Sequence, residues 1–236
     1  MKLSLNRNQL KYLALFAMVV DHIAWAFVPI ASSAGQLMHF FGRLTGPIMA
    51  FFLAEGYLHT RSVWRYAFRL ALFALISWPA CSYFMLGKWF GAFFGVIYTL
   101  FLGLLAIIVY DRSSFPSWLK IVLIALLCLA SYYGDWTGFD VLWPLCLVIY
   151  KDDPVEKWRR FFLITAIAAF FMLPYGWDNL FQVGVFVPAL LLRFCYNGEP
   201  GSRLPFHKWF FYFFYPAHLL ILDLLLIHRV VTPFSF

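Results

Sequence analysis

Six ionisable residues lie inside apolar stretches of this sequence, where a charged side chain has no water to solvate it. At the bilayer centre such a residue costs about 3 kcal/mol or more, so it normally faces protein or a water-filled cavity. An imidazole is well matched to general base catalysis near neutral pH, and Asp or Arg beside it can orient it or stabilise developing charge. The candidates for such chemistry are therefore Asp21, His22, Arg43, Glu55, His218 and Asp223.

Five of these residues fall at a similar depth when each is counted at about 1.5 Å per residue from the expected cytoplasmic end of its helix. Asp21 and His22 lie at about 16–18 Å and Arg43 at about 21 Å. His218 and Asp223 lie at about 13 Å and 21 Å. Because groups on different helices can meet only at matching heights, we expect one buried site near the bilayer centre, built from three helices.

Asp21 and His22 are adjacent, so on a helix they point about 100° apart and do not form a dyad with each other. One of them is expected to face Arg43 or the last span, and the other a cavity. Glu55 and His39 fall outside the band, near the cytoplasmic and outer surfaces respectively. The alternative interpretation is structural: each polar residue ties helices together by a hydrogen bond, or an Asp–Arg pair neutralises itself.

Composition indicates the elements that must position these residues. Hydrophobic residues make up 64% of the chain and charged residues 12%, against roughly 25% charged in soluble domains. We therefore expect an all-α polytopic integral membrane protein, with residues 1–236 forming one transmembrane domain and the first span retained rather than cleaved. At roughly 20 residues per span, nine spans are expected, at 10–30, 38–57, 66–86, 91–110, 117–133, 138–150, 160–176, 180–196 and 209–229.

Positive charges predict the orientation, because they favour cytoplasmic loops. With the N-terminus in the cytoplasm, fifteen of the eighteen Lys and Arg residues fall on that side, leaving Lys88 and Arg229 outside and Arg43 within a span. The net charge of +7 thus reflects the topology. It also indicates that the cytoplasmic side attracts anionic lipid or an anionic cytoplasmic ligand. No nucleic acid partner is expected.

The four cysteines lie in apolar spans, without CxxC spacing or a nearby histidine. We interpret them as small hydrophobic residues, and we expect no metal site and no disulfide.

Two spans carry breaks beside residues of the band. Gly46 and Pro47 follow Arg43, and Pro216 precedes His218. Proline removes a backbone hydrogen bond and frees a carbonyl one turn earlier, which membranes tolerate where neighbours or cavity water satisfy it.

Three arginines spaced by four residues follow the second span, namely Arg61, Arg65 and Arg69. Guanidinium groups bind phosphates through paired hydrogen bonds, so this set could cradle a phosphorylated ligand. The alternative is a solvated or lipid-facing set of arginines. We assign the three arginines, with Glu55 just before them, to ligand binding.

Three blocks of sequence resemble the TraX family of bacterial membrane proteins, whose founding member acetylates the N-terminus of conjugative pilin. The blocks are "VVDHIAWAF", "FGRLTGPIMAFFLAEGYLHTRSVWRYAFRLALFALISWP" and "KWFFYFFYPAHLLIL". The resemblance implies an acyltransferase of the bacterial inner membrane that takes acetyl from acetyl-CoA. The acceptor is expected to be an amine or hydroxyl of the envelope, such as a pilin N-terminus or a glycan.

Combined with the polar band, the resemblance leads to a mechanistic hypothesis. Acetyl-CoA docks from the cytoplasm beside the arginines, and His22 accepts the proton of the acceptor as it attacks. Asp21 and Arg43 orient the base or the oxyanion, and His218 is a second base or an oxyanion donor. Burial strengthens these interactions and limits hydrolysis of the thioester. Two other functions stay open: a proton-coupled transporter, and a non-enzymatic subunit of pilus or envelope assembly.

Overall fold

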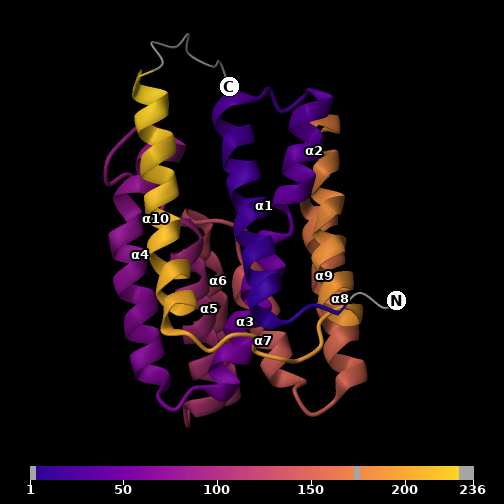
Figure 1. The fold of residues 1–236 in the computed structure, drawn as a ribbon. Coiled ribbons are helices and arrows are strands. Elements are labelled where there is room, and N and C mark those ends of the chain that lie inside the picture. Colours follow the sequence, from indigo (N-terminus) through magenta and orange to yellow (C-terminus); the bar gives the residue numbers. More distant parts are fainter. Residues whose placement is uncertain (1–3, 173–175, 229–236) are drawn as a thin grey trace.

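The apolar stretches fold into α-helices that run side by side in one bundle in a computed structural model, which describes residues 4–172 and 176–228 (Figure 1). The α-helices are α1 Arg7–Phe27, α2 Ser33–Gly42, α3 Thr45–His59, α4 Val63–Leu86, α5 Gly95–Arg112, α6 Ser117–Ala130, α7 Phe139–Ile149, α8 Pro154–Met172, α9 Phe186–Phe194 and α10 Pro205–His228. Two 3₁₀-helices, η1 Ser131–Tyr133 and η3 Trp177–Val185, connect them. The all-helical class predicted from composition is confirmed.

Among the described residues, five helical segments are long and apolar enough to cross a membrane. They are Arg7–Phe27, Ser33–His59, Val63–Leu86, Gly95–Arg112 and Pro205–Leu226, with shorter apolar helices at Ser117–Tyr133 and Phe139–Ile149. The chain is therefore a membrane protein, whereas the count of nine spans and the cytoplasmic N-terminus stay predictions. Residues 173–175 of the predicted span 160–176 and residue 229 of the last span lie outside the described residues.

Local sequence accounts for where several helices begin and end. Asn6 accepts a hydrogen bond from the Gln9 N–H, and the Gln9 side chain accepts one from the Asn6 N–H, so α1 starts with a capping box. The Ser62 hydroxyl accepts from the Arg65 N–H at the start of α4. That helix ends at Gly87, which has a positive φ of 64° and so takes a backbone conformation that costs glycine little.

The second predicted span is broken into α2 and α3 at Arg43 and Leu44. Pro47 has no N–H for the Arg43 carbonyl and its ring crowds that carbonyl, so the helix interrupts one turn before the proline. The break leaves Arg43 at the end of α2, with its side chain turned into the bundle. Pro216, in contrast, lies inside α10, and the helix continues on both sides of it.

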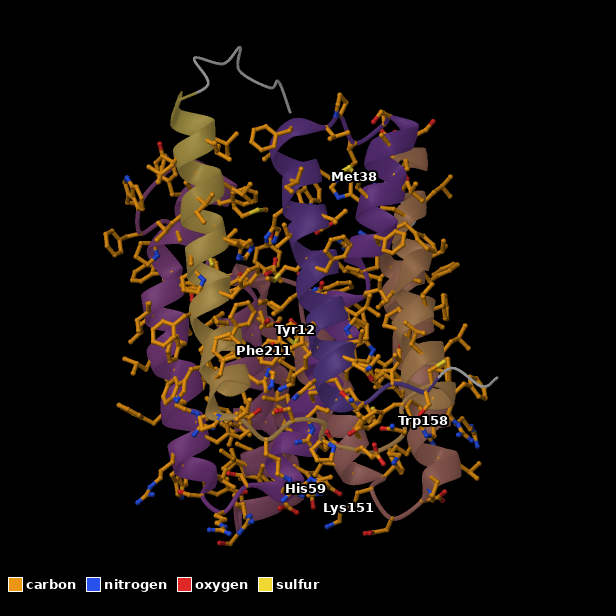
Figure 2. All side chains as sticks on the ribbon, viewed as in Figure 1. Tyr12, Met38, His59, Lys151, Trp158 and Phe211 are labelled. Atoms are coloured by element: carbon orange, nitrogen blue, oxygen red, sulfur yellow. The ribbon has the colours of Figure 1, made fainter. Side chains whose placement is uncertain are left out.

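Packing brings the first and last helices together although they are far apart in sequence. α1 packs against α2, α3 and α10, and α10 also packs against α4. Figure 2 shows His59 and Lys151 at one end of the bundle, Met38 toward the other end, and Tyr12 close to Phe211 between them. We call the end with His59 and Lys151 the basic end.

Candidate active site

Asp21 on α1 is buried, with 8% of its surface exposed, and two side chains from α2 and its end hold it. The His39 Nδ1–H donates to Oδ1 at 2.8 Å. The Arg43 Nη2 donates to Oδ1 and Oδ2 at 3.3 and 3.2 Å. Gly42 packs directly on this carboxylate, and a Cβ at that position would overlap it. The Asp21–Arg43 pair predicted as one option is therefore formed, and it depends on a glycine between the two donors.

Arg43 is held rigidly by groups from distant parts of the chain. Its guanidinium carbon lies 4.7 Å from the ring centre of Trp136 and 5.1 Å from that of Phe181. Its Nη1 donates to Gln182 Oε1 at 3.3 Å. Trp136 itself has a positive φ of 59°, which costs energy for a residue with a side chain and is often found at functional sites. These contacts fix one positive charge at the centre of the bundle.

His39 is a member of the site that sequence reasoning placed near the outer surface. It is fully buried, its ring packs on Trp25 and Phe181, and Nε2 has no hydrogen-bond partner within the described residues. The helix begins five residues before the predicted start of its span, which moves this position inward. The signal in the sequence is its spacing of four from Arg43, since residues four apart share a helix face.

His22 faces α10, where its Nδ1 lies 2.8 Å from His218 Nε2 and the two rings stack 5.0 Å apart. His218 Nδ1 lies 3.0 Å from the Phe214 carbonyl oxygen. A carbonyl oxygen only accepts, so in neutral His218 the proton is on Nδ1 and Nε2 is the acceptor. His22 must then carry its proton on Nδ1, which leaves Nε2 with a free lone pair.

His22 lines a small chamber of about 150 Å³ between the helices. Asp21, His22 and Arg43 all line the chamber. His218 is not among the lining residues and stands behind His22 as its hydrogen-bond partner. Three of the five residues of the predicted band therefore line one hollow, and a fourth, His218, contacts one of them.

The fifth residue of the band, Asp223, does not join them. It is 1% exposed, neither carboxylate oxygen has a hydrogen-bond partner within the described residues, and it does not line the chamber. Asp135 lines the chamber instead. It comes from the turn after η1, which was not assigned to the site from the sequence, because only the tertiary contacts bring that turn inward.

A larger cavity of about 580 Å³ extends from this region to the basic end. Exposed residues of the α3–α4 turn and of the loop before α10 form its mouth. Its described lining contains no Asp or Glu. It contains five cationic side chains, namely Arg7, Lys11, Arg61, Arg69 and Arg203.

Of the five cations, only Arg7 has a carboxylate partner within the described residues, through Arg7 Nε and Glu55 Oε2 at 2.8 Å. Lys11 instead packs its ammonium on Phe52 and Phe211, 5.6 and 5.2 Å from the ring centres. Buried positive charge without a counter-ion is costly. The cavity therefore favours an anionic ligand.

Arg69 shows the same lack of a counter-ion within the described residues. Its guanidinium lies against the rings of Tyr66 and Tyr212, and its buried Nε has no hydrogen-bond partner. A planar guanidinium group has several N–H donors and binds phosphate through paired hydrogen bonds. A phosphate at Arg69 would satisfy that donor.

The structure divides the four residues predicted to bind the ligand. Arg61 and Arg69 line the larger cavity, whereas Arg65 is exposed and is not among its lining residues. Glu55 accepts hydrogen bonds from Arg7 and, at 2.6 Å, from the Tyr196 hydroxyl. It therefore holds the cavity-lining Arg7 in place but does not line the cavity itself.

The two cavities adjoin. Met18, Thr45, Val96 and Tyr215 line both of them, and so form the junction between the cationic cavity and the chamber of His22. Within the described residues, no group of three or more His, Cys, Asp or Glu side chains is arranged to hold a metal ion.

Comparison with known proteins agrees with the sequence resemblance. A model of the TraX protein family matches residues 6–226. "Probable fimbrial assembly protein FimC, serogroup H1" of Dichelobacter nodosus is 34% identical over 230 residues, covering 91% of this chain and 93% of that protein. No solved structure matches the chain. The protein belongs to the TraX family.

Proposed function

We propose that this protein is a membrane-embedded acyltransferase, which moves an acetyl group from acetyl-CoA bound at the basic end to an amine or hydroxyl of an envelope acceptor. One observation carries the proposal. A cavity that is lined by five cations, and by no carboxylate within the described residues, adjoins a buried chamber whose histidine has a free lone pair. Anion binding and general base catalysis are the two capacities that such a transfer requires.

The shape of the donor follows from the distance between the two regions. Arg7 and His22 are fifteen residues apart on α1, which corresponds to about 22 Å along the helix. A donor bound by its phosphates near the basic end must therefore carry its reactive group on a long, thin arm. Acetyl-CoA has phosphates at one end and a thioester at the end of such an arm. The aromatic rings of Tyr66 and Tyr212 beside Arg69 offer stacking surfaces for its adenine.

His22 acts as the general base. The acceptor nitrogen or oxygen attacks the thioester carbonyl carbon, and its proton moves to His22 Nε2 as the new bond forms. The carbon–sulfur bond then breaks, and the CoA thiolate takes the proton back from His22. Acetylated acceptor and CoA thiol are the products, and the enzyme returns to its starting protonation state.

The other residues of the band support this base. His218 accepts the His22 Nδ1–H, which keeps the reactive lone pair on Nε2. Asp21 and Arg43 form a fixed pair of opposite charges at the chamber wall, so neither needs to reorganise during the reaction. The buried position of the chamber limits the access of water to the thioester.

The acceptor belongs to the cell envelope. The relative named as a fimbrial assembly protein supports a pilus subunit as that acceptor, and a glycan is the other acceptor class. The inner membrane is the proposed location, because the donor is a cytoplasmic metabolite.

The test uses the full chain in lipid nanodiscs with acetyl-CoA labelled in its acetyl group and a mixture of pilin peptides and glycans. We expect label transfer or slow label hydrolysis by the wild type, and a loss of about 100-fold or more with His22→Ala, the range for a general base. Cys128→Ala, outside both cavities, is the matched control for folding and background hydrolysis. Equal transfer by folded wild type and folded His22→Ala would remove His22 as the base. A folded wild type that neither transfers nor hydrolyses the label would exclude the acyltransferase and favour a non-enzymatic assembly role.

A further inference from the structure

Tyr215 occupies the junction between the two cavities. It belongs to the "YPAH" part of a block that resembles the TraX family, but no role was assigned to it from the sequence. It lies on α10, three residues before His218, so the two side chains share a helix face. Its ring centre is 5.6 Å from that of His218, which in turn stacks on His22. Only 4% of its surface is exposed, yet it lines both cavities.

The Tyr215 oxygen is held from two sides. The Val96 N–H at the start of α5 donates to it at 3.1 Å, and Cys81 Sγ lies 3.3 Å away. Gly95 makes this approach feasible: its φ is 76°, and a Cβ there would collide with the Tyr215 hydroxyl and the Cys81 sulfur. The backbone at the start of α5 is thus shaped around this oxygen.

The proton of the Tyr215 hydroxyl has no strong acceptor in the described part of the chain. Val96 is a donor, and a thiol sulfur is a weak acceptor. The donation from Val96 polarises the phenol and strengthens the hydrogen bond that its O–H can make to a third group.

We propose that the Tyr215 hydroxyl is the oxyanion donor of the acyl transfer, a catalytic residue that hydrogen-bonds the thioester carbonyl oxygen. The proposal rests on the proposed function. When the acceptor attacks, the carbonyl π electrons move onto that oxygen, and Tyr215 stabilises the charge while keeping its proton. When the carbon–sulfur bond breaks, the electrons return and the carbonyl forms again.

The positions of His22 and Tyr215 fit their proposed roles as general base and oxyanion donor. His22 and Tyr215 both line the small chamber, and His218 contacts both rings. The acyl arm enters through the junction, so its carbonyl passes the Tyr215 hydroxyl before it reaches His22. The purely structural alternative is that this hydroxyl only ties α10 to α5.

The test compares Tyr215→Phe with Tyr98→Phe in the full chain in nanodiscs. Tyr98 is the matched control, because its hydroxyl donates to a backbone carbonyl, of Ala130, and it lines neither cavity. Loss of an oxyanion donor typically lowers kcat about 100- to 1000-fold, and we expect that loss for Tyr215→Phe with an unchanged affinity for free CoA. Tyr98→Phe should retain the wild-type kcat.

A second readout does not depend on turnover. The probe is a ketone analogue of acetyl-CoA in which a methylene replaces the thioester sulfur, labelled with ¹³C at the carbonyl. A hydrogen bond from Tyr215 should shift its infrared carbonyl stretch to lower frequency in the wild type and in Tyr98→Phe, and this shift should vanish in Tyr215→Phe.

The outcomes separate the two proposals. An unshifted carbonyl in a wild type that binds CoA and transfers acetyl, or a Tyr215→Phe protein with the wild-type kcat, overturns the role of Tyr215 and leaves the acyltransferase standing. A folded wild type that neither binds CoA nor transfers acetyl overturns the acyltransferase, and the role of Tyr215 with it.

Discussion

The protonation pattern of His22 gives a prediction that can be checked without any substrate. In the structure, His218 donates to the Phe214 carbonyl and accepts from His22, so His22 carries its proton on Nδ1. We expect neutral His22 to be an Nδ1–H tautomer, although this tautomer is the scarcer one in a free imidazole. His218→Phe keeps a ring in the stack but removes the acceptor, and the preference should then disappear.

The size of the preference follows from the two hydrogen bonds. Moving the proton of His22 to Nε2 either sets two lone pairs against each other at 2.8 Å or forces His218 to give up its bond to Phe214. A neutral hydrogen bond contributes about 0.5–1.5 kcal/mol net, and a buried group left unsatisfied costs about 1–3 kcal/mol. A total near 1–3 kcal/mol corresponds to a tautomer ratio of roughly 5 to 150. For the same reason, His218→Phe should lower kcat by roughly 2- to 10-fold.

The assay is ¹⁵N NMR of histidine-labelled protein in nanodiscs, with His22→Gln used to assign the His22 signals. We expect a protonated-type shift for Nδ1 and an unprotonated-type shift for Nε2 in the wild type. In His218→Phe both shifts should move toward the average of the two tautomers. An Nε2–H tautomer in the wild type would refute the hydrogen-bond chain and remove His22 Nε2 as the base. The same conclusion would follow if the ¹⁵N chemical shifts of His22 were unchanged in His218→Phe.

Three further predictions concern the charges and the packing of the site. Asp21→Asn leaves the Arg43 guanidinium buried without its counter-ion. We expect the free energy of unfolding, measured by SDS titration in mixed micelles, to fall by about 3–5 kcal/mol. A fall below about 1 kcal/mol would contradict the pairing. Gly42→Ala places a Cβ on the Asp21 carboxylate, so the same assay should show a free energy of unfolding that is lower by about 1–3 kcal/mol. An unchanged free energy of unfolding would show that the contact is loose. Arg69→Ala removes a cavity-lining cation, whereas Arg65→Ala does not. In steady-state kinetics, the KM for acetyl-CoA should therefore rise about 10- to 100-fold in Arg69→Ala and little in Arg65→Ala. Equal effects of the two variants on KM would remove Arg69 from the donor site.

The sequence alone determined the class of the protein and most of the candidate site. The apolar composition indicated a bundle of membrane helices. Because a charge inside the membrane is costly, Asp21, His22, Arg43 and His218 could be chosen as candidate site residues from the sequence alone. Matching depth predicted that they would meet, since helical rise is nearly constant. The break beside Arg43 likewise followed from the missing N–H of a proline.

The tertiary structure decided which faces of the helices meet. Periodicity groups residues on a helix face but does not say what that face contacts, so Asp223 shares the predicted depth yet lies apart, and Arg65 shares the predicted row yet points outward. Lys11, Asp135 and Tyr215 had no role predicted from the sequence, and they became part of the cavities only through packing between segments far apart in sequence. The cost of burying a charge is local and can be read residue by residue, whereas a cavity exists only between elements and depends on how all of them pack.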